Sequence, residues 1–206
     1  MYSVLWRLYR LRVFDCDRAG GAFLRYREML QPGRLSVVDL SDAGLSELSN
    51  IAVADVLRGI QEEQERAYRD FEAGRAQAPA RVLIVIEEAH EFLGAERSEK
   101  TPHLFAQVAR IAKRGRKRWL GLAFVTQLPQ QLPRAVLGLC NNFVLHKLTD
   151  PQVVSTLKHT VSGIDEGLWS RLPGLAPGQA IVSFGHMARP LLAAIDPAPC
   201  KLRMVD

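Results

Sequence analysis

The sequence predicts an α/β fold with a mostly parallel sheet flanked by helices. Short apolar runs alternate with longer amphipathic segments along the chain, and this alternation is typical of strands joined by crossover helices. Two of the apolar runs end in polar residues, as strands of such sheets do where they carry side chains to a binding edge. The fold class and the position of a candidate site therefore follow from the same pattern.

The first half of the chain supplies three predicted elements. After the turn signal at residues 31–33, residues 35–40 (LSVVDL) predict a strand, and residues 45–72, rich in Glu, Arg and Ala, predict a long helix. Residues 82–86 (VLIVI) are apolar at every position. That composition predicts a central strand covered by helices on both faces.

The second half continues the alternation. Thr101 and Pro102 predict a helix start, and Gly115 can end that helix. Further elements are predicted as strands over 120–125, 143–148, 180–184 and 191–195, and as a helix from Asp150-Pro151, with the last two strands forming a hairpin or a pair of edge strands.

Composition bounds the class of protein. The 206 residues are 48% hydrophobic, and 27 Lys and Arg against 22 Asp and Glu give a net charge of +5, which excludes wholesale disorder and a miniprotein built on disulfides. Cys16, Cys140 and Cys200 are widely separated and form no CxxC pair, so we expect no zinc site. Without an apolar run long enough for a membrane helix or a signal peptide, a cytoplasmic protein is expected.

The strongest functional signal is the pair Glu87 and Glu88, directly after the apolar run 82–86. In a nucleotide hydrolase the first carboxylate can hold Mg²⁺, usually through water, and the second can orient or deprotonate the water that attacks the γ-phosphate. Capping of the next helix is the alternative. Thr126 and Gln127 follow the next predicted strand, where Gln127 either senses the γ-phosphate or merely begins a loop.

These residues resemble the HerA and FtsK-like P-loop ATPases, in particular the ATPase domain of the HerA type. The segments that carry the resemblance are GRLSVVDLS (33–41), VLIVIEEAHEFL (82–93), ARIAKRGRKRWLGLAFVTQLP (109–129), CNNFVLHKLTDP (140–151) and GQAIVSFGHMARPLLAAI (178–195). The resemblance implies a RecA-like core that binds ATP and Mg²⁺, assembles as a homo-oligomeric ring, usually a hexamer, and couples hydrolysis to DNA translocation or unwinding. DNA end processing, repair or defence with a nuclease partner is the implied setting.

Roles follow from the resemblance by motif. Glu87 occupies the place of the Walker B acid on Mg²⁺, Glu88 that of the catalytic glutamate, and Gln127 that of the polar sensor. Arg114 and Arg116 match the region from which the family offers an arginine to the neighbouring subunit's nucleotide, and Arg110 is a weaker candidate. Apart from the resemblance, this basic segment can be a solvated helix end. A nucleic-acid patch is a third alternative with weak support, because Trp119 is the only aromatic residue interleaved with the cations and no recognition helix appears.

One departure from the family is clear: the sequence contains no G-x-x-x-x-G-K-[ST] loop, whose backbone N–H groups and Lys would cradle the phosphates. We therefore expect a partial RecA-like domain over residues 30–195 that lacks the first strand and the P-loop, with 1–30 outside the resemblance and 196–206 as a tail. Isolated ATPase activity should be low. A truncated or split ATPase and a natural short protein both remain open.

Two further functions stay open. The chain can be a catalytically incomplete ATPase-fold subunit that acts as a scaffold or donates an arginine in trans. It can also be a DNA-pumping ATPase of the conjugation or packaging type, which would share the Glu pair.

Overall fold

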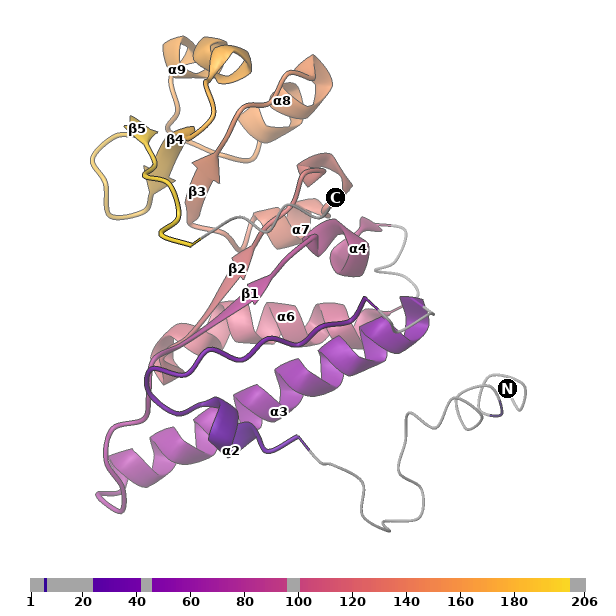
Figure 1. Cartoon of the computed structure of the whole chain (residues 1–206), viewed down its shortest axis with the longest axis vertical. Coiled ribbons are helices and arrows are strands. Elements are labelled where there is room, and N and C mark those ends of the chain that lie inside the picture. Colours follow the sequence, from indigo (N-terminus) through magenta and orange to yellow (C-terminus); the bar gives the residue numbers. More distant parts are fainter. Residues whose placement is uncertain (1–5, 7–23, 42–45, 96–100, 201–206) are drawn as a thin grey trace.

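The computed structural model describes residues 6, 24–41, 46–95 and 101–200, and it has the predicted α/β class. Figure 1 shows two parts, a parallel strand pair with long helices and a small antiparallel sheet with short helices. The first part contains α2 (Tyr26–Met29), α3 (Ser46–Glu72), β1 (Val82–Ile86), α4 (Ala89–Leu93), α6 (Pro102–Arg114), η1 (Gly115–Arg118) and β2 (Leu120–Phe124). Next come η2 (Pro129–Gln131), α7 (Arg134–Leu137), β3 (Asn142–Leu145), α8 (Pro151–Lys158), α9 (Glu166–Arg171), η3 (Leu172–Gly174), β4 (Gln179–Phe184) and β5 (Leu191–Ala194).

The parallel pair β1–β2 has its predicted arrangement. Val82 pairs with Leu120 and Ile86 with Phe124, and α6 provides the crossover that parallel strands require. In α6, Leu104, Val108 and Ile111 recur on one helical face and are each 1% exposed. They pack with apolar residues of α3, β1 and β2 into the first core.

Coverage of β1 on both faces was predicted, and this prediction is wrong. Ile86 is buried and Ile84 packs against the core, but Leu83 is 65% and Val85 57% exposed. Alternate strand residues point to opposite faces, and α3 and α6 both lie on the same side of the pair (Figure 1). Among the described residues nothing buries the second face.

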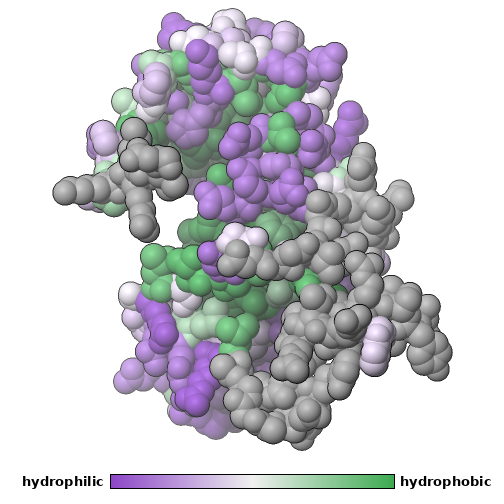
Figure 2. All heavy atoms as spheres, turned by 45° about the vertical axis from the view of Figure 1, so that its right-hand side comes forward, coloured by the Kyte–Doolittle hydropathy of each residue, from purple (hydrophilic) through white to green (hydrophobic). Residues whose placement is uncertain are grey.

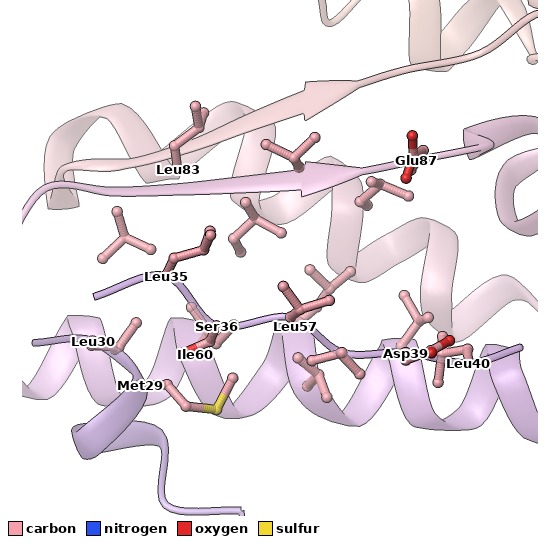
Figure 3. A pocket seen from close by; sticks show the side chains of 18 of the residues that line it. Met29, Leu30, Leu35, Ser36, Asp39, Leu40, Leu57, Ile60, Leu83 and Glu87 are labelled. Carbon is pink, nitrogen blue, oxygen red and sulfur yellow. The ribbon is translucent and has the colours of Figure 1, made fainter. Parts of the chain in front are cut away.

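The strand predicted over residues 35–40 is also absent. The segment is extended, but the structure assigns it no strand, and Leu35 and Val37 are 88% and 81% exposed. Figure 3 shows it lying beside α3, with a hollow between it and β1. A strand requires ladder hydrogen bonds as well as an apolar sequence, and β1 pairs with β2 alone among the described strands.

Gly115 follows the last residue of α6 as predicted, and the chain then makes the η1 turn into β2. A Cβ atom at Gly115 would clash with the carbonyl oxygen of Leu120. The glycine is therefore required by close backbone approach.

The antiparallel sheet has the order β3–β4–β5, so the predicted terminal hairpin is confirmed. Two aspartates cap its helices: Asp150 accepts a hydrogen bond from the N–H of Gln152 at 2.8 Å, and Asp165 accepts one from Leu168 at 2.9 Å. Trp169 and Ile181 are buried in a second core. Parallel pairing is thus confined to β1–β2 among the described strands.

The boundaries predicted at residues 30 and 195 stay predictions, and much of the two flanking segments, 1–5, 7–23 and 201–206, lies outside the described residues. In the part of the chain that is described, no helix combines the length and apolarity needed to cross a membrane.

Candidate functional site

Glu87 and Glu88 lie directly beyond the carboxyl end of β1, as predicted. Glu88 adopts the left-handed region, with φ 46° and ψ 46°, and precedes the first turn of α4. Such a conformation is uncommon for a residue other than glycine and occurs often at functional sites. Its side chain makes no capping hydrogen bond to α4, which argues against the capping alternative.

Gln127 is brought to Glu88 by the parallel register. The N–H of Val125 donates to the carbonyl of Ile86, and the N–H of Ala89 donates to the carbonyl of Val125, both at 2.9 Å. These bonds extend the pairing beyond β2. Gln127 Nε2 then donates to Glu88 Oε1 at 3.1 Å. A residue that follows β1 and a residue that follows β2 are thus in contact at the carboxyl edge of the strand pair.

His90 and Thr126 belong to the same cluster. His90 Nδ1 lies 3.0 Å from Thr126 Oγ1 and 3.3 Å from Glu88 Oε2, and its side chain is 10% exposed. Thr126 Oγ1 also accepts from the N–H of Leu128 at 3.1 Å. Neither residue has a role predicted from the sequence, although each stands within two positions of a residue that does, Glu88 or Gln127.

One oxygen of this cluster is unsatisfied. Glu88 Oε2 is buried and has no hydrogen-bond partner in the structure, because the approach of His90 Nδ1 has the distance of an ion pair without the geometry of a hydrogen bond. Buried polar atoms are almost always paired, so an orphaned one calls for an explanation. An ordered water or ligand atom at Glu88 would supply the missing partner.

Glu87 is exposed. Beside the hollow of about 1110 Å³ it faces Asp39 from the extended segment (Figure 3). A hydrogen bond from the N–H of Ser41, at 2.9 Å, holds the pKa of Asp39 below its ordinary value. Figure 2 shows hydrophobic residues gathered in the middle of this view, between more hydrophilic ends.

The carboxylates fit Mg²⁺ only in a limited way. No group of three or more His, Cys, Asp or Glu side chains with metal-binding geometry occurs among the described residues. Protein-bound Mg²⁺ commonly keeps several waters and uses one or two carboxylates together with substrate phosphates. Glu87, an exposed carboxylate that lines the hollow one residue before Glu88, fits that donor set.

Arg114 and Arg116 are not brought to this edge. They lie at the end of α6 and in η1, before β2 begins, whereas Gln127 follows the end of β2. The five residues of β2 span about 17 Å at roughly 3.3 Å per residue. Arg110 lies one turn earlier in α6, and no hydrogen bond or ion pair joins it to Glu88 or Gln127 among the described residues.

Comparison with known proteins supports the predicted resemblance. No protein-family model matches the sequence. The DNA double-strand break repair helicase HerA of Saccharolobus solfataricus is 28% identical over 169 residues, which are 82% of this chain and 32% of that protein. HerA of Sulfolobus acidocaldarius is 29% identical over 174 residues, 84% of this chain and 34% of the relative. HerA of Sulfurisphaera tokodaii is 30% identical over 125 residues, 61% of this chain and 25% of the relative.

Solved structures show the same fold. VirB4 of Thermoanaerobacter pseudethanolicus superimposes with a TM-score of 0.53 at 19% identity, covering 78% of this chain and 40% of that one. The genome packaging NTPase B204 of Sulfolobus turreted icosahedral virus 2, in complex with ATP-gammaS, gives 0.55 at 12% identity, covering 86% and 74%. The chain is therefore similar in sequence to HerA helicases and has the fold of these P-loop ATPases, and it spans about a quarter to a third of the length of those HerA relatives.

Proposed function

We propose that the chain forms part of a HerA-like ring ATPase, expected to be a hexamer in the cytoplasm, that couples ATP hydrolysis to movement or unwinding of DNA. DNA end processing, repair or defence with a nuclease partner is the proposed setting. The observation that carries the proposal is the contact between Gln127 Nε2 and Glu88 Oε1 at the carboxyl edge of a parallel strand pair. Ligands of open α/β sheets bind at such an edge.

Each carboxylate has a proposed task. Glu88 orients the attacking water and accepts its proton as the water oxygen bonds to the γ-phosphorus and the bond to the leaving ADP oxygen breaks. Glu87 holds Mg²⁺ through water, and the ion neutralises charge on the phosphate oxygens. Gln127 fixes the Glu88 carboxylate and contacts the γ-phosphate. The unpaired Oε2 of Glu88 supports a water at this position.

The arginines are proposed to act between subunits. Arg114 ends α6 and Arg116 lies in η1, so the length of β2, about 17 Å, separates both from the Glu88 edge of their own chain, too far for either to reach a nucleotide held there. Both are exposed. An arginine from a neighbouring subunit would neutralise charge that builds on the transferring phosphoryl oxygens, so hydrolysis would depend on assembly.

DNA is the proposed partner of the assembled ring. Arg110, Lys113, Arg114, Arg116 and Lys117 are exposed, and within the part of the chain that is described none of them pairs with a carboxylate. A concentration of uncompensated cations favours binding to a phosphate backbone and makes it sensitive to salt.

A second candidate rests on a different observation. The sequence has no P-loop motif, and its arginines lie far from its own Glu88. Both features suit a subunit that donates Arg114 or Arg116 to the nucleotide of a complete ATPase, or that only scaffolds the ring. A conjugation or packaging motor is the third candidate.

The second candidate is tested by mixing the chain with a complete HerA-type ATPase. If ATP turnover of the mixture rises when the chain is added, and does not rise when its Arg114→Ala variant is added, the arginine-donor function is supported.

The main proposal is tested by ATP turnover of the purified chain with Mg²⁺, alone and with duplex DNA. Glu88→Gln should lower any turnover by about 10²–10⁴-fold, the usual contribution of a general base. Glu166→Gln is the matched control, because Glu166 is exposed and, among the described residues, forms its ion pair with Lys158 in the other part of the molecule. Turnover that survives Glu88→Gln unchanged would contradict the proposal.

A further inference from the structure

Three aromatic rings meet at the carboxyl end of α3, on the far side of the fold from Glu88. Trp119 lies edge-to-face on Tyr68, with ring centroids 5.6 Å apart, and its centroid lies 5.8 Å from that of Phe71. The ring centroids of Tyr68 and Phe71 are 6.2 Å apart. None of the three belongs to either hydrophobic core, and Phe71 is 37% exposed. The cluster therefore places apolar ring surface at the exterior.

The backbone that carries Trp119 is held in an unusual conformation. Trp119 has φ 56° and ψ 36°, a left-handed conformation that is a genuine outlier for a bulky residue and that persists only where its surroundings impose it. Gln64, 1% exposed, supplies that constraint: its Nε2 donates to the carbonyl of Arg118 at 2.9 Å and to that of Ala80 at 2.8 Å. The turn before β2 is thus anchored to α3.

One cation contacts the rings, and two more precede it in the chain. The guanidinium of Arg118 stacks 4.5 Å from the Tyr68 centroid and lies 3.8 Å from a carboxylate oxygen of Glu72. Arg116 and Lys117 are exposed and have no carboxylate partner in the described ranges. The surface formed by Tyr68, Phe71, Arg116, Lys117, Arg118 and Trp119, here called the aromatic–basic patch, combines ring faces with free positive charge.

We propose that the aromatic–basic patch binds single-stranded nucleic acid, with an unpaired base stacked on Phe71 and Trp119 and backbone phosphates on Arg116 and Lys117. Aromatic rings beside a positively charged track are how proteins bind single strands without reading sequence. Bases within a duplex are already stacked, so the rings would add nothing there. An acidic peptide would use only the charges.

The site deepens the proposed function by giving the DNA a contact surface, and it needs no ATP. It lies at the amino ends of β1 and β2, opposite the Glu88 edge. Arg116 cannot serve a strand of nucleic acid and a neighbouring nucleotide at once, so this assignment leaves Arg114 for the trans role.

The test is fluorescence anisotropy of a labelled oligothymidylate with the purified chain, without nucleotide, over a series of salt concentrations. Trp119→Leu, which keeps an apolar side chain but removes the ring, should weaken binding about tenfold, within the range measured for one stacked base. Trp119→Phe should retain most of the affinity. Arg116→Ala with Lys117→Ala should flatten the slope of log affinity against log salt by about 1.4, as two lost phosphate contacts on a single strand do.

Controls separate the outcomes. The double variant Lys147→Ala and Arg189→Ala removes two exposed cations elsewhere. It should leave the slope of log affinity against log salt as it is in the parent chain. If Trp119→Leu melts at room temperature by circular dichroism, Phe71→Leu against Phe71→Tyr repeats the comparison at a more exposed ring. If Trp119→Leu binds the oligothymidylate as tightly as Trp119→Phe does, the proposal is overturned. The patch would then attract the strand by charge alone, in the way that it would attract an acidic peptide. Oligothymidylate binding by a chain that turns over no ATP would support this site independently of the ATPase proposal, which the Glu88→Gln comparison tests separately.

Discussion

Gln127 Nε2 lies 3.1 Å from Glu88 Oε1 although the two residues are 39 positions apart in the chain. The contact exists because β1 and β2 run parallel in register, so that their carboxyl ends coincide. It leaves the second oxygen of Glu88 buried and unpaired. A carboxylate that is fixed on one side and unsatisfied on the other is suited to hold a reacting water.

Replacement of Gln127 by Ala should therefore act on the chemical step. Loss of the donor frees the Glu88 carboxylate to rotate, and we expect ATP turnover in the assembled protein to fall about tenfold to a hundredfold with much less change in ATP affinity, since one misplaced catalytic group costs that much. Gln130→Ala is the control, because Gln130 is exposed in η2, three residues after Gln127. Equal loss in both variants would show that the segment after β2, rather than the contact, matters.

His90→Ala should lower the free energy of unfolding by about 1–3 kcal/mol, because Thr126 Oγ1 loses one of its two hydrogen-bond partners in a poorly exposed site and keeps only the N–H of Leu128 among the described contacts. His90→Asn places an amide near the position of Nδ1 and should recover part of that loss. Urea denaturation measures both. Identical stabilities for the Ala and Asn variants would show that the ring fills space without holding Thr126.

Gly115→Ala should destabilise the protein by about 1–3 kcal/mol, because the added Cβ clashes with the Leu120 carbonyl and the anchored backbone must shift. Gly174→Ala is the matched control: a Cβ at Gly174 meets nothing within 4 Å, and the change should be neutral or stabilising by about 0.4–1 kcal/mol. Thermal unfolding of the two variants side by side checks the difference. A harmless Gly115→Ala would mean that the turn before β2 is not fixed as described.

Tyr26 attaches α2 to α3 in a manner that depends on pH. Its hydroxyl donates to Asp55 Oδ2 at 2.9 Å, and burial, together with this hydrogen bond, raises the pKa of Tyr26 to about 12. An unfolded tyrosine has a pKa of about 10. The stabilisation is therefore fully present below about pH 10 and is lost as the pH rises towards 12.

Tyr26→Phe should abolish this loss, so that the stability of the variant changes less between pH 10 and 12 than that of the parent chain. Denaturant midpoints across that range measure it. Parallel pH profiles for the two proteins would contradict the assigned contact.

Local sequence predicted the elements that depend on local patterns. The apolar runs at 82–86 and 120–125 became β1 and β2, and Pro102 and Asp150-Pro151 marked helix starts. The run at 35–40 had the same local pattern but formed no strand, because pairing depends on a neighbour that the local pattern does not specify.

The sequence was sufficient to select the glutamates and Gln127 of the candidate site, but it was not sufficient to select His90 and Thr126. Glu88 and Gln127 stand at strand ends, which is a local signal. His90 meets Thr126 across 36 residues, and Trp119 meets Tyr68 from a different helix. Such contacts follow from strand register and helix packing, so the neighbouring sequence of these residues does not predict them.

The most direct test of the account is a titration of the purified, isotopically labelled chain with Mg²⁺ and ATP, followed by backbone amide chemical shifts. A nucleotide site at the Glu88–Gln127 edge should give saturable shifts concentrated at Glu87 to Glu91 and Val125 to Leu128, and Glu88→Gln should reduce them. Shifts confined to the turn at residues 115–119, or no saturable shift in the first two segments, would contradict a nucleotide site at the Glu88–Gln127 edge.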